Sequence, residues 1–234
     1  MTVKQQVDKY DNYIPYPEHL KLLVRATDAT TSGMKDFSGY GRVITQYGNT
    51  TGSTTQKKIN PYSMYFDGSG DYLSLSDSDD WNFGSNDFTI VTWVKRSSIG
   101  SEGWVLAKLQ SGSTNLFRCD FETDNRPLFQ IKTDVSTYYV YGTAITDTTS
   151  WHQIGMIRSG NTLYAITDGV LSTGVAVSGS IPTESTKVIV GARPDALTTY
   201  NYAGYIDELA IWNGVAIPIS QLYPQYKPYS FRRA

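Results

Sequence analysis

An alternating run near the C-terminus, AGYIDELAIWN (Ala203–Asn213), constrains the fold more than any other stretch. Its side chains divide between the two faces of a strand as Tyr205, Asp207, Leu209 and Ile211 against Ile206, Glu208, Ala210 and Trp212. Apolar groups on both faces predict a strand in the middle of two packed sheets. Asp207 is the exception, because an unpaired buried charge is costly. It needs backbone N–H donors, a cation or a place at the rim of the sandwich.

The rest of the chain carries further short alternating runs, separated by turns rich in Gly, Ser, Asn and Asp. The best defined is a three-strand meander that begins within residues 151–169. Its first two strands, WHQIGMIR and TLYAI, are joined by the turn SGN, and the turn DG leads into the third strand. Eighteen tyrosines and twenty glycines also favour strands and tight turns over helices. We expect one short helical stretch at Pro218–Tyr223, which Pro224 ends. The sequence therefore predicts an all-β fold.

Composition excludes two classes of partner. A net charge of −2 and a pI near 5.7 lack the basic excess of a general nucleic-acid binder. No apolar run approaches the length of a membrane span, and the N-terminal MTVKQQVDKYDN has no apolar core of a secretion signal. We therefore expect a protein made in a cytoplasm, with neither nucleic acid nor membrane as its partner.

Both ends of the chain differ from the middle. Residues 1–19 are predicted to form an extended arm, because prolines alternate with tyrosines in YDNYIPYPEH. Two interpretations stay open: a terminus lying on the protein's own surface or disordered, and an arm that docks on a partner through Tyr10, Tyr13 and Tyr16. Residues 227–234 form a small basic tail, which we interpret as solvated or as a docking segment.

The single cysteine, Cys119, excludes an intramolecular disulfide. It alternates with apolar neighbours in NLFRCDF, which predicts a packed thiol on a strand. A nucleophilic role would need a positioned base, and the chain has only His19 and His152.

Taken together, these motifs resemble the laminin-G-like jelly-roll domains of the concanavalin A-like lectin/glucanase superfamily. The resemblance covers residues 20–226 and implies a two-sheet antiparallel jelly-roll sandwich behind the N-terminal arm. The matching segments follow the family's order: YFDGSGDYLSL (65–75), DFTIVTWVK (87–95), LAK (106–108), WHQIGMIRSGNTLYAITDG (151–169), VIVGA (188–192), GYIDELAIWN (204–213) and SQLY (220–223).

The chain departs from the family at a few positions. Gln153 stands where a second histidine usually follows the Trp-His pair, and Ile166-Thr167 stands where a valine usually leads into the Asp-Gly turn. Most relatives are modules of long secreted proteins, whereas stand-alone examples without a signal resemble bacteriophage virion components. We therefore expect a non-catalytic module on the virion surface, such as a capsid decoration, fibre or tail protein. Its partners would be other virion proteins, further copies in a homo-oligomer, or host surface glycans.

The resemblance also implies a structural calcium ion, since many relatives carry one. Asp207, Asp67 and Asp71 are the candidate ligands, if the closed sandwich brings these carboxylates together. The alternative is that Asp67 caps its own turn and that Asp207 binds backbone donors.

Exposed aromatics beside amides are the feature expected of a glycan site. Tyr200, Asn201 and Tyr202 on a predicted loop are the preferred candidates. Tyr139 and Tyr141 share one strand face and are either packed or part of the same surface; Trp104 is a further, isolated candidate.

Catalysis has little support in the sequence. Glucanases of this superfamily use paired acids on one strand face, whereas Glu122-Thr123-Asp124 lacks a third acid and precedes a turn. Asp207 and Glu208 are adjacent and are predicted to point to opposite faces. A free calcium-assisted lectin or a degenerate glycoside hydrolase remains the alternative to a virion module.

Overall fold

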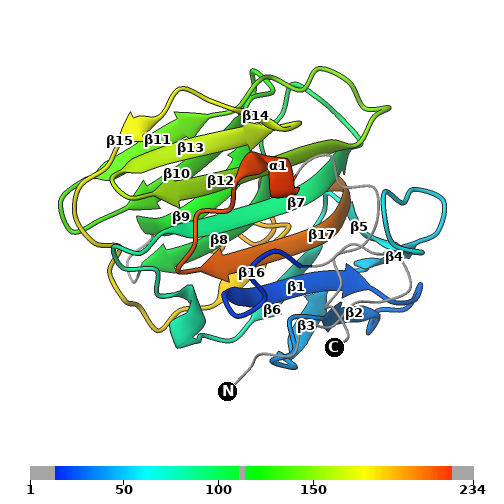
Figure 1. The fold of residues 1–234 in the computed structure, drawn as a ribbon. Helices are drawn as coiled ribbons and strands as arrows, with labels where there is room; N and C mark the ends of the chain where they lie inside the picture. The colour runs from blue at the N-terminus through cyan, green and yellow to red at the C-terminus, as the bar shows by residue number, and fades with distance from the viewer. Residues whose placement is uncertain (1–13, 111–113, 223–234) are drawn as a thin grey trace.

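The computed structural model describes residues 14–110 and 114–222. In this part of the chain two antiparallel sheets pack face to face, and helix is confined to two short segments (Figure 1). The predicted all-β, two-sheet sandwich is therefore confirmed.

One sheet has ten strands and forms the layer nearer the viewer in Figure 1. Its main path runs β14-β13-β12-β7-β17-β1-β2; β5 also pairs with β17, β4 pairs with β5, and β15 pairs with β13. The strands are β1 (Leu20–Ala26), β2 (Met34–Asp36), β4 (Thr51–Ser53), β5 (Ser63–Asp67), β7 (Phe88–Arg96), β12 (His152–Ser159), β13 (Thr162–Thr167), β14 (Val170–Leu171), β15 (Val175–Ala176) and β17 (Ala203–Asn213). The predicted meander is β12, β13 and β14.

The other sheet has seven strands in the order β11-β10-β9-β8-β16-β6-β3. These are β3 (Ile44–Tyr47), β6 (Tyr72–Leu75), β8 (Gly103–Gln110), β9 (Thr114–Phe121), β10 (Pro127–Lys132), β11 (Thr137–Tyr141) and β16 (Val188–Val190). A 3-10 turn η1 (Asp79–Trp81) follows β6.

The main hydrophobic core lies between the sheets. Alternation supplies it from both layers, with Leu106 and Phe129 on one side and Ile154 and Ile206 on the other. Each such side chain contributes roughly 1.5–3 kcal/mol when removed from water. Cys119 belongs to this core, which confirms the predicted packed thiol.

Strand β17 crosses the middle of the ten-stranded sheet, as predicted, but its alternation breaks. Its pairing with β7 shifts register between Asp207 and Ala210, and Glu208 has a positive φ of 53°. These features define a β-bulge, in which an extra residue reverses the faces of all residues after it. Leu209 therefore shares the inter-sheet core with Ile206. The predicted placement of Asp207 on the face of Leu209 is wrong.

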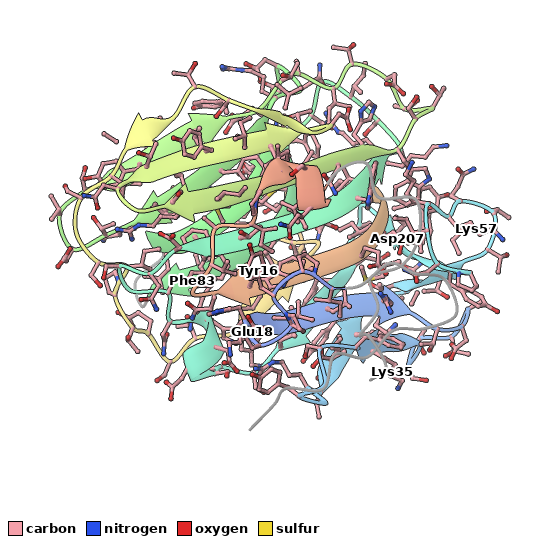
Figure 2. The ribbon with its side chains drawn as sticks, viewed as in Figure 1. Tyr16, Glu18, Lys35, Lys57, Phe83 and Asp207 are labelled. Atoms are coloured by element: carbon pink, nitrogen blue, oxygen red, sulfur yellow. The ribbon has the colours of Figure 1, made fainter. Side chains whose placement is uncertain are left out.

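A second hydrophobic cluster covers the outer face of the ten-stranded sheet. Ile14 and Trp212 are both buried in it, and the Trp212 indole N–H donates to the Pro15 carbonyl over 2.8 Å. Residues 14–19, which include the Tyr16 and Glu18 labelled in Figure 2, lie over this face. The end of the predicted arm thus packs on the protein's own sheet, while Tyr10 and Tyr13 lie outside the described residues.

The predicted helical stretch is confirmed as α1 (Ile219–Leu222), which lies over the same outer face (Figure 1). The Gln153 amide, at the position of the family's histidine, donates to the Leu222 carbonyl over 2.9 Å and ties α1 to β12. Among the described residues, no helix is long and apolar enough to span a membrane.

Candidate functional site

Asp207 is buried and is held by a loop. Its carboxylate accepts hydrogen bonds from the backbone N–H groups of Lys58, Ile59 and Asn60, over 3.0–3.3 Å, and from the Asn60 side-chain amide over 2.7 Å. Figure 2 shows Asp207 on the side of β17 that faces the loop carrying Lys57. Of the three partners that the sequence left open for Asp207, the structure has backbone donors.

The bulge turns Glu208 toward the same loop. The Asn60 amide also donates to Glu208 over 2.6 Å, and the Arg25 guanidinium binds both Glu208 oxygens. The prediction that Asp207 and Glu208 point to opposite faces is therefore wrong. Burial, together with the neighbouring charge of Glu208, raises the pKa of Asp207 to about 6.

The other two candidate calcium ligands serve turns. Asp67 accepts from the Ser69 N–H over 2.7 Å, whereas Asp71 accepts from the N–H groups of Asn49 and Asp67. Asp67 pairs with Ala203, and Ala203 precedes Asp207 by four residues along β17. The backbones of Asp67 and Asp207 are therefore about 13 Å apart. The predicted convergence of these three carboxylates is wrong. Within residues 14–110 and 114–222, no group of three or more His, Cys, Asp or Glu is arranged to hold a metal. Calcium binding itself stays a prediction.

His152 is placed between two carboxylates. Its Nδ1 lies 2.6 Å from Asp168 and its Nε2 lies 2.9 Å from Asp147. Hydrogen bonds to Asp168, and then to Asp147, raise the pKa of His152 above its ordinary value. Because both ring nitrogens are engaged, this histidine ties the turn at Asp168 to the loop at Asp147.

The outer face of the seven-stranded sheet presents a different surface. Cross-strand register aligns two rows of outward side chains, Trp104–Asp120–Leu128–Tyr141 and Ala107–Arg118–Gln130–Tyr139. The intervening residues Cys119, Phe129 and Val140 point into the core. Tyr139 and Tyr141 are 47% and 37% exposed. Of the two interpretations that the sequence left open, exposure on a surface is the one observed.

Beside β8 and β9 on this face lies a polar and aromatic group, here called the Trp104 cluster. It comprises Trp104, Arg118, Asp120, Arg193, Tyr200 and Asn201.

Strand pairing and stacked cations position this cluster. The backbone N–H of Trp104 donates to the Tyr200 carbonyl over 3.0 Å, and Trp104 forms a parallel bridge with Asn201. The Arg118 guanidinium lies 4.7 Å from the centre of the indole ring. The Arg193 guanidinium lies 5.5 Å from the indole and 5.6 Å from the Tyr200 ring.

The cluster gathers most of the unpartnered polar atoms. In the described part of the chain, six buried side-chain nitrogen or oxygen atoms have no hydrogen-bond partner. Four of them belong to the Trp104 cluster: Trp104 Nε1, Arg118 Nε, Asp120 Oδ1 and Asn201 Oδ1. Buried polar atoms without a hydrogen bond are costly, although two of these four, Arg118 Nε and Asp120 Oδ1, face each other as an ion pair.

Asp120 is the most perturbed acid of the cluster. Its Oδ1 lies 3.5 Å from the Arg118 Nε, an ion pair without hydrogen-bond geometry. Burial raises the pKa of Asp120 to about 7, although the positive charge of Arg118 opposes the shift. Burial thus favours the neutral form of this carboxyl.

The predicted ligand residues divide between the surface and the core. Tyr200 is 46% exposed and Asn201 belongs to the cluster. Tyr202 is 1% exposed and lies edge-on to Phe66 in the core, so its predicted position on an exposed loop is wrong. Alternation from Asn201 turns the next side chain inward, and burial raises the pKa of Tyr202.

Sequence reasoning missed Arg118, Asp120 and Arg193. A signal existed for the first two, because they flank the buried Cys119 and alternation must place them outward. Arg193 follows β16 in an irregular segment, where the sequence offers no period to follow.

Two packed antiparallel sheets with a polar, aromatic outer surface define a lectin-like jelly-roll domain. A laminin G family model, described as the concanavalin A-like lectin/glucanases superfamily, matches residues 67–217. The chain belongs to this superfamily. No curated protein sequence matches it.

Solved structures with this fold include clostridial toxin domains. The binding domain of Paraclostridial mosquitocidal protein 1 superposes with a TM-score of 0.68 at 13% identity, covering 88% of this chain and 51% of that chain. The binding domain of botulinum neurotoxin DC, solved with rat synaptotagmin II, gives 0.66 at 12%, with 89% and 51% covered. Botulinum neurotoxin type C, described as interacting with two ganglioside molecules, gives 0.65 at 11%, with 88% and 50% covered. This chain thus spans about half the length of those it matches, and at these identities the similarity is one of fold.

Proposed function

We propose that this protein is a non-catalytic carbohydrate-binding module and that the Trp104 cluster is the centre of its glycan surface. The observation that carries the proposal is the gathering of four unpartnered buried polar atoms in that cluster. Buried donors and acceptors normally have partners, and a bound ligand would supply them.

The aromatic surroundings support a sugar as that ligand. Tyr200 belongs to the cluster, and Tyr139 and Tyr141 stand on the same outer face on β11, which β9 and β10 separate from β8. Aromatic rings offer flat apolar contact beside a polar hydroxyl, which suits the mixed apolar and polar faces of a sugar ring. The Arg126 guanidinium, 4.2 Å from the Tyr141 ring, adds a polar rim.

The toxin domains of the same fold lend further support. They are binding domains, and those described above are associated with gangliosides and with a protein receptor. Carrying such a role over to this chain is part of the proposal, because identity is low and only half of each toxin domain is matched.

The alternative within the superfamily is glycoside hydrolysis. It would need two carboxyl groups flanking a bond; the candidates beside Arg118 are Asp120, on β9 and in the cluster, and Glu122, which directly follows β9. Both lie within 4 Å of Arg118, which holds them as ion-pair partners, so we favour binding over catalysis.

The virion setting, the docking arm with Tyr10, Tyr13 and Tyr16, homo-oligomers and the calcium ion stay predictions from the sequence. A calcium-assisted lectin remains the rival among binding functions, and the glycan screen below includes a chelator for this reason.

The test is a glycan-array screen of the purified protein with calcium and with chelator, followed by titration of the best ligand. We expect Tyr200→Ala to weaken binding roughly tenfold, as loss of one aromatic contact implies, without lowering the Tm. The matched control is Tyr40→Ala, since Tyr40 is exposed elsewhere, beside Lys21. An array blank in both conditions, or release of reducing sugar from a bound glycan, would contradict the proposal.

A further inference from the structure

We infer that the Trp104 cluster selects uncharged, hydroxyl-bearing sugars and rejects sugars that carry a carboxylate or sulfate. The inference rests on the proposed function and adds the chemical class of the ligand, which neither the fold nor the toxin domains provide.

The first argument is the balance of donors and acceptors. Two of the unpartnered atoms are donors, Trp104 Nε1 and Arg118 Nε, and two are acceptors, Asp120 Oδ1 and Asn201 Oδ1. A bound anion accepts only, and a metal ion binds acceptors only. A hydroxyl group both donates and accepts, so a hydroxyl, rather than a carboxylate or sulfate group, is the part of a ligand that satisfies a mixed set.

The second argument is charge. Arg193 is already bound in bidentate fashion by Asp195, at 2.7 and 3.1 Å. Arg118 lies 3.5 Å from Asp120 and 3.9 Å from Glu122.

The acids therefore exceed the cations around the cluster. Glu102 is a further carboxylate close enough to raise the pKa of Asp120. An incoming carboxylate would meet Glu102, Glu122 and the ionised form of Asp120, with no guanidinium left without an acidic neighbour, and like charges brought together cost several kcal/mol.

Access requires movement of side chains rather than of the sheet. The unpartnered atoms are covered, whereas the side chains of Tyr200 and Arg193, beside the indole, are partly exposed. A ligand hydroxyl would reach the indole N–H after side chains at the rim of the cluster, such as Arg193, move aside, while the exposed Tyr200 ring contacts the sugar. A buried water molecule could satisfy the same four atoms, and the experiment must separate it from a sugar.

The experiment compares matched neutral and acidic glycans on the full chain: lactose against 3′-sialyllactose, and galactan against polygalacturonate. We expect at least roughly tenfold tighter binding of the neutral member of a pair. Asp120→Asn and Glu122→Gln remove negative charge with little change of shape. Each should reduce the ratio between the affinities for the neutral and the acidic glycan. Asp79→Asn, at the exposed 3-10 turn η1, is the control and should leave it unchanged.

The outcomes separate this inference from the proposed function. Equal or tighter binding of the acidic member would overturn the inference while leaving a carbohydrate-binding module in place. Glycan binding that is the same in the wild-type protein, in Asp120→Asn and in Glu122→Gln would also overturn the inference, because the four atoms would then hold water only. Binding to no glycan, neutral or acidic, would overturn the proposed function and the inference with it.

Discussion

At the scale of single residues, His152 gives the protein a pH-dependent contribution to stability. The folded state binds its proton more tightly than the unfolded chain does, because Asp168 and Asp147 both accept hydrogen bonds from the imidazolium. Below about pH 6.5, the ordinary histidine pKa, both states carry the proton and the full stabilisation is present. As the pH rises through the raised pKa of the folded state, this stabilisation is lost.

We therefore expect His152→Gln to lower the Tm by roughly 2–4 °C near pH 5.5, corresponding to about 1 kcal/mol. The difference from the wild-type protein should shrink near pH 9, since the wild-type ring is then neutral. Thermal unfolding followed by circular dichroism at both pH values checks this. Asp168→Asn, which removes one of the two carboxylates, should show the same trend. An equal loss of Tm at both pH values would mean that His152 acts through packing alone.

At the scale of elements, the bulge in β17 lies where two neighbouring strands, β5 and β1, pair with different parts of the same side of β17. Strand β5 pairs with residues 203–206 and β1 with residues 209–212, so no strand pairs with Asp207 and Glu208 on that side. The loop at residues 58–60 and the Arg25 side chain occupy this position and bind both carboxylates. The bulge thus lets two adjacent acids face one set of donors.

The segment at residues 14–19 is the second element with a structural role, and Ile14 is its buried anchor. We expect Ile14→Ala to destabilise the protein by roughly 2–4 kcal/mol, because it leaves a cavity above Trp212. Urea unfolding of the full chain measures this. Val43→Ala is the control, since Val43 is 78% exposed and should change stability by less than about 0.5 kcal/mol. Equal stabilities of the two variants would show that this segment does not support the sheet.

At the scale of the whole molecule, Cys119 reports on global unfolding. It is the only cysteine, it lies in the core between the sheets, and burial raises the pKa of its thiol. We expect a thiol reagent to label it only when the sandwich opens, so that the labelling rate rises with denaturant in parallel with loss of the far-ultraviolet signal. Cys119→Ser should abolish the label. Fast and complete labelling of the native protein would contradict the packing seen here.

The two outer faces of the sandwich differ in a way that matters for binding. The protein's own segments, residues 14–19 and α1, cover much of the ten-stranded sheet. On the side of the seven-stranded sheet, Tyr139, Tyr141 and Tyr200 are exposed, and the Trp104, Asp120 and Asn201 side chains of the Trp104 cluster are buried beneath that face. This difference is why the proposed glycan surface lies on the latter.

The sequence by itself determined the two-sheet sandwich, its central strand β17, the meander β12–β14, the short helix and the buried Cys119. These follow from local patterns, because strand period, turn residues and helix breakers act within a few positions along the chain. Half of the candidate site was named from the sequence, as Trp104, Tyr200 and Asn201. Arg118 and Asp120 were missed, although the period around Cys119 places both of them outward.

Only the tertiary structure decided the rest. The bulge depends on which strands and loop meet β17, and a single extra residue there reversed the predicted faces of Asp207 and Leu209. The inward turn of Tyr202 and the approach of Arg193 to Trp104 arise from an irregular segment with no period. The physical reason is the same in each case. Partners far apart in the chain fix these side chains, and the local sequence does not specify which distant segments will meet.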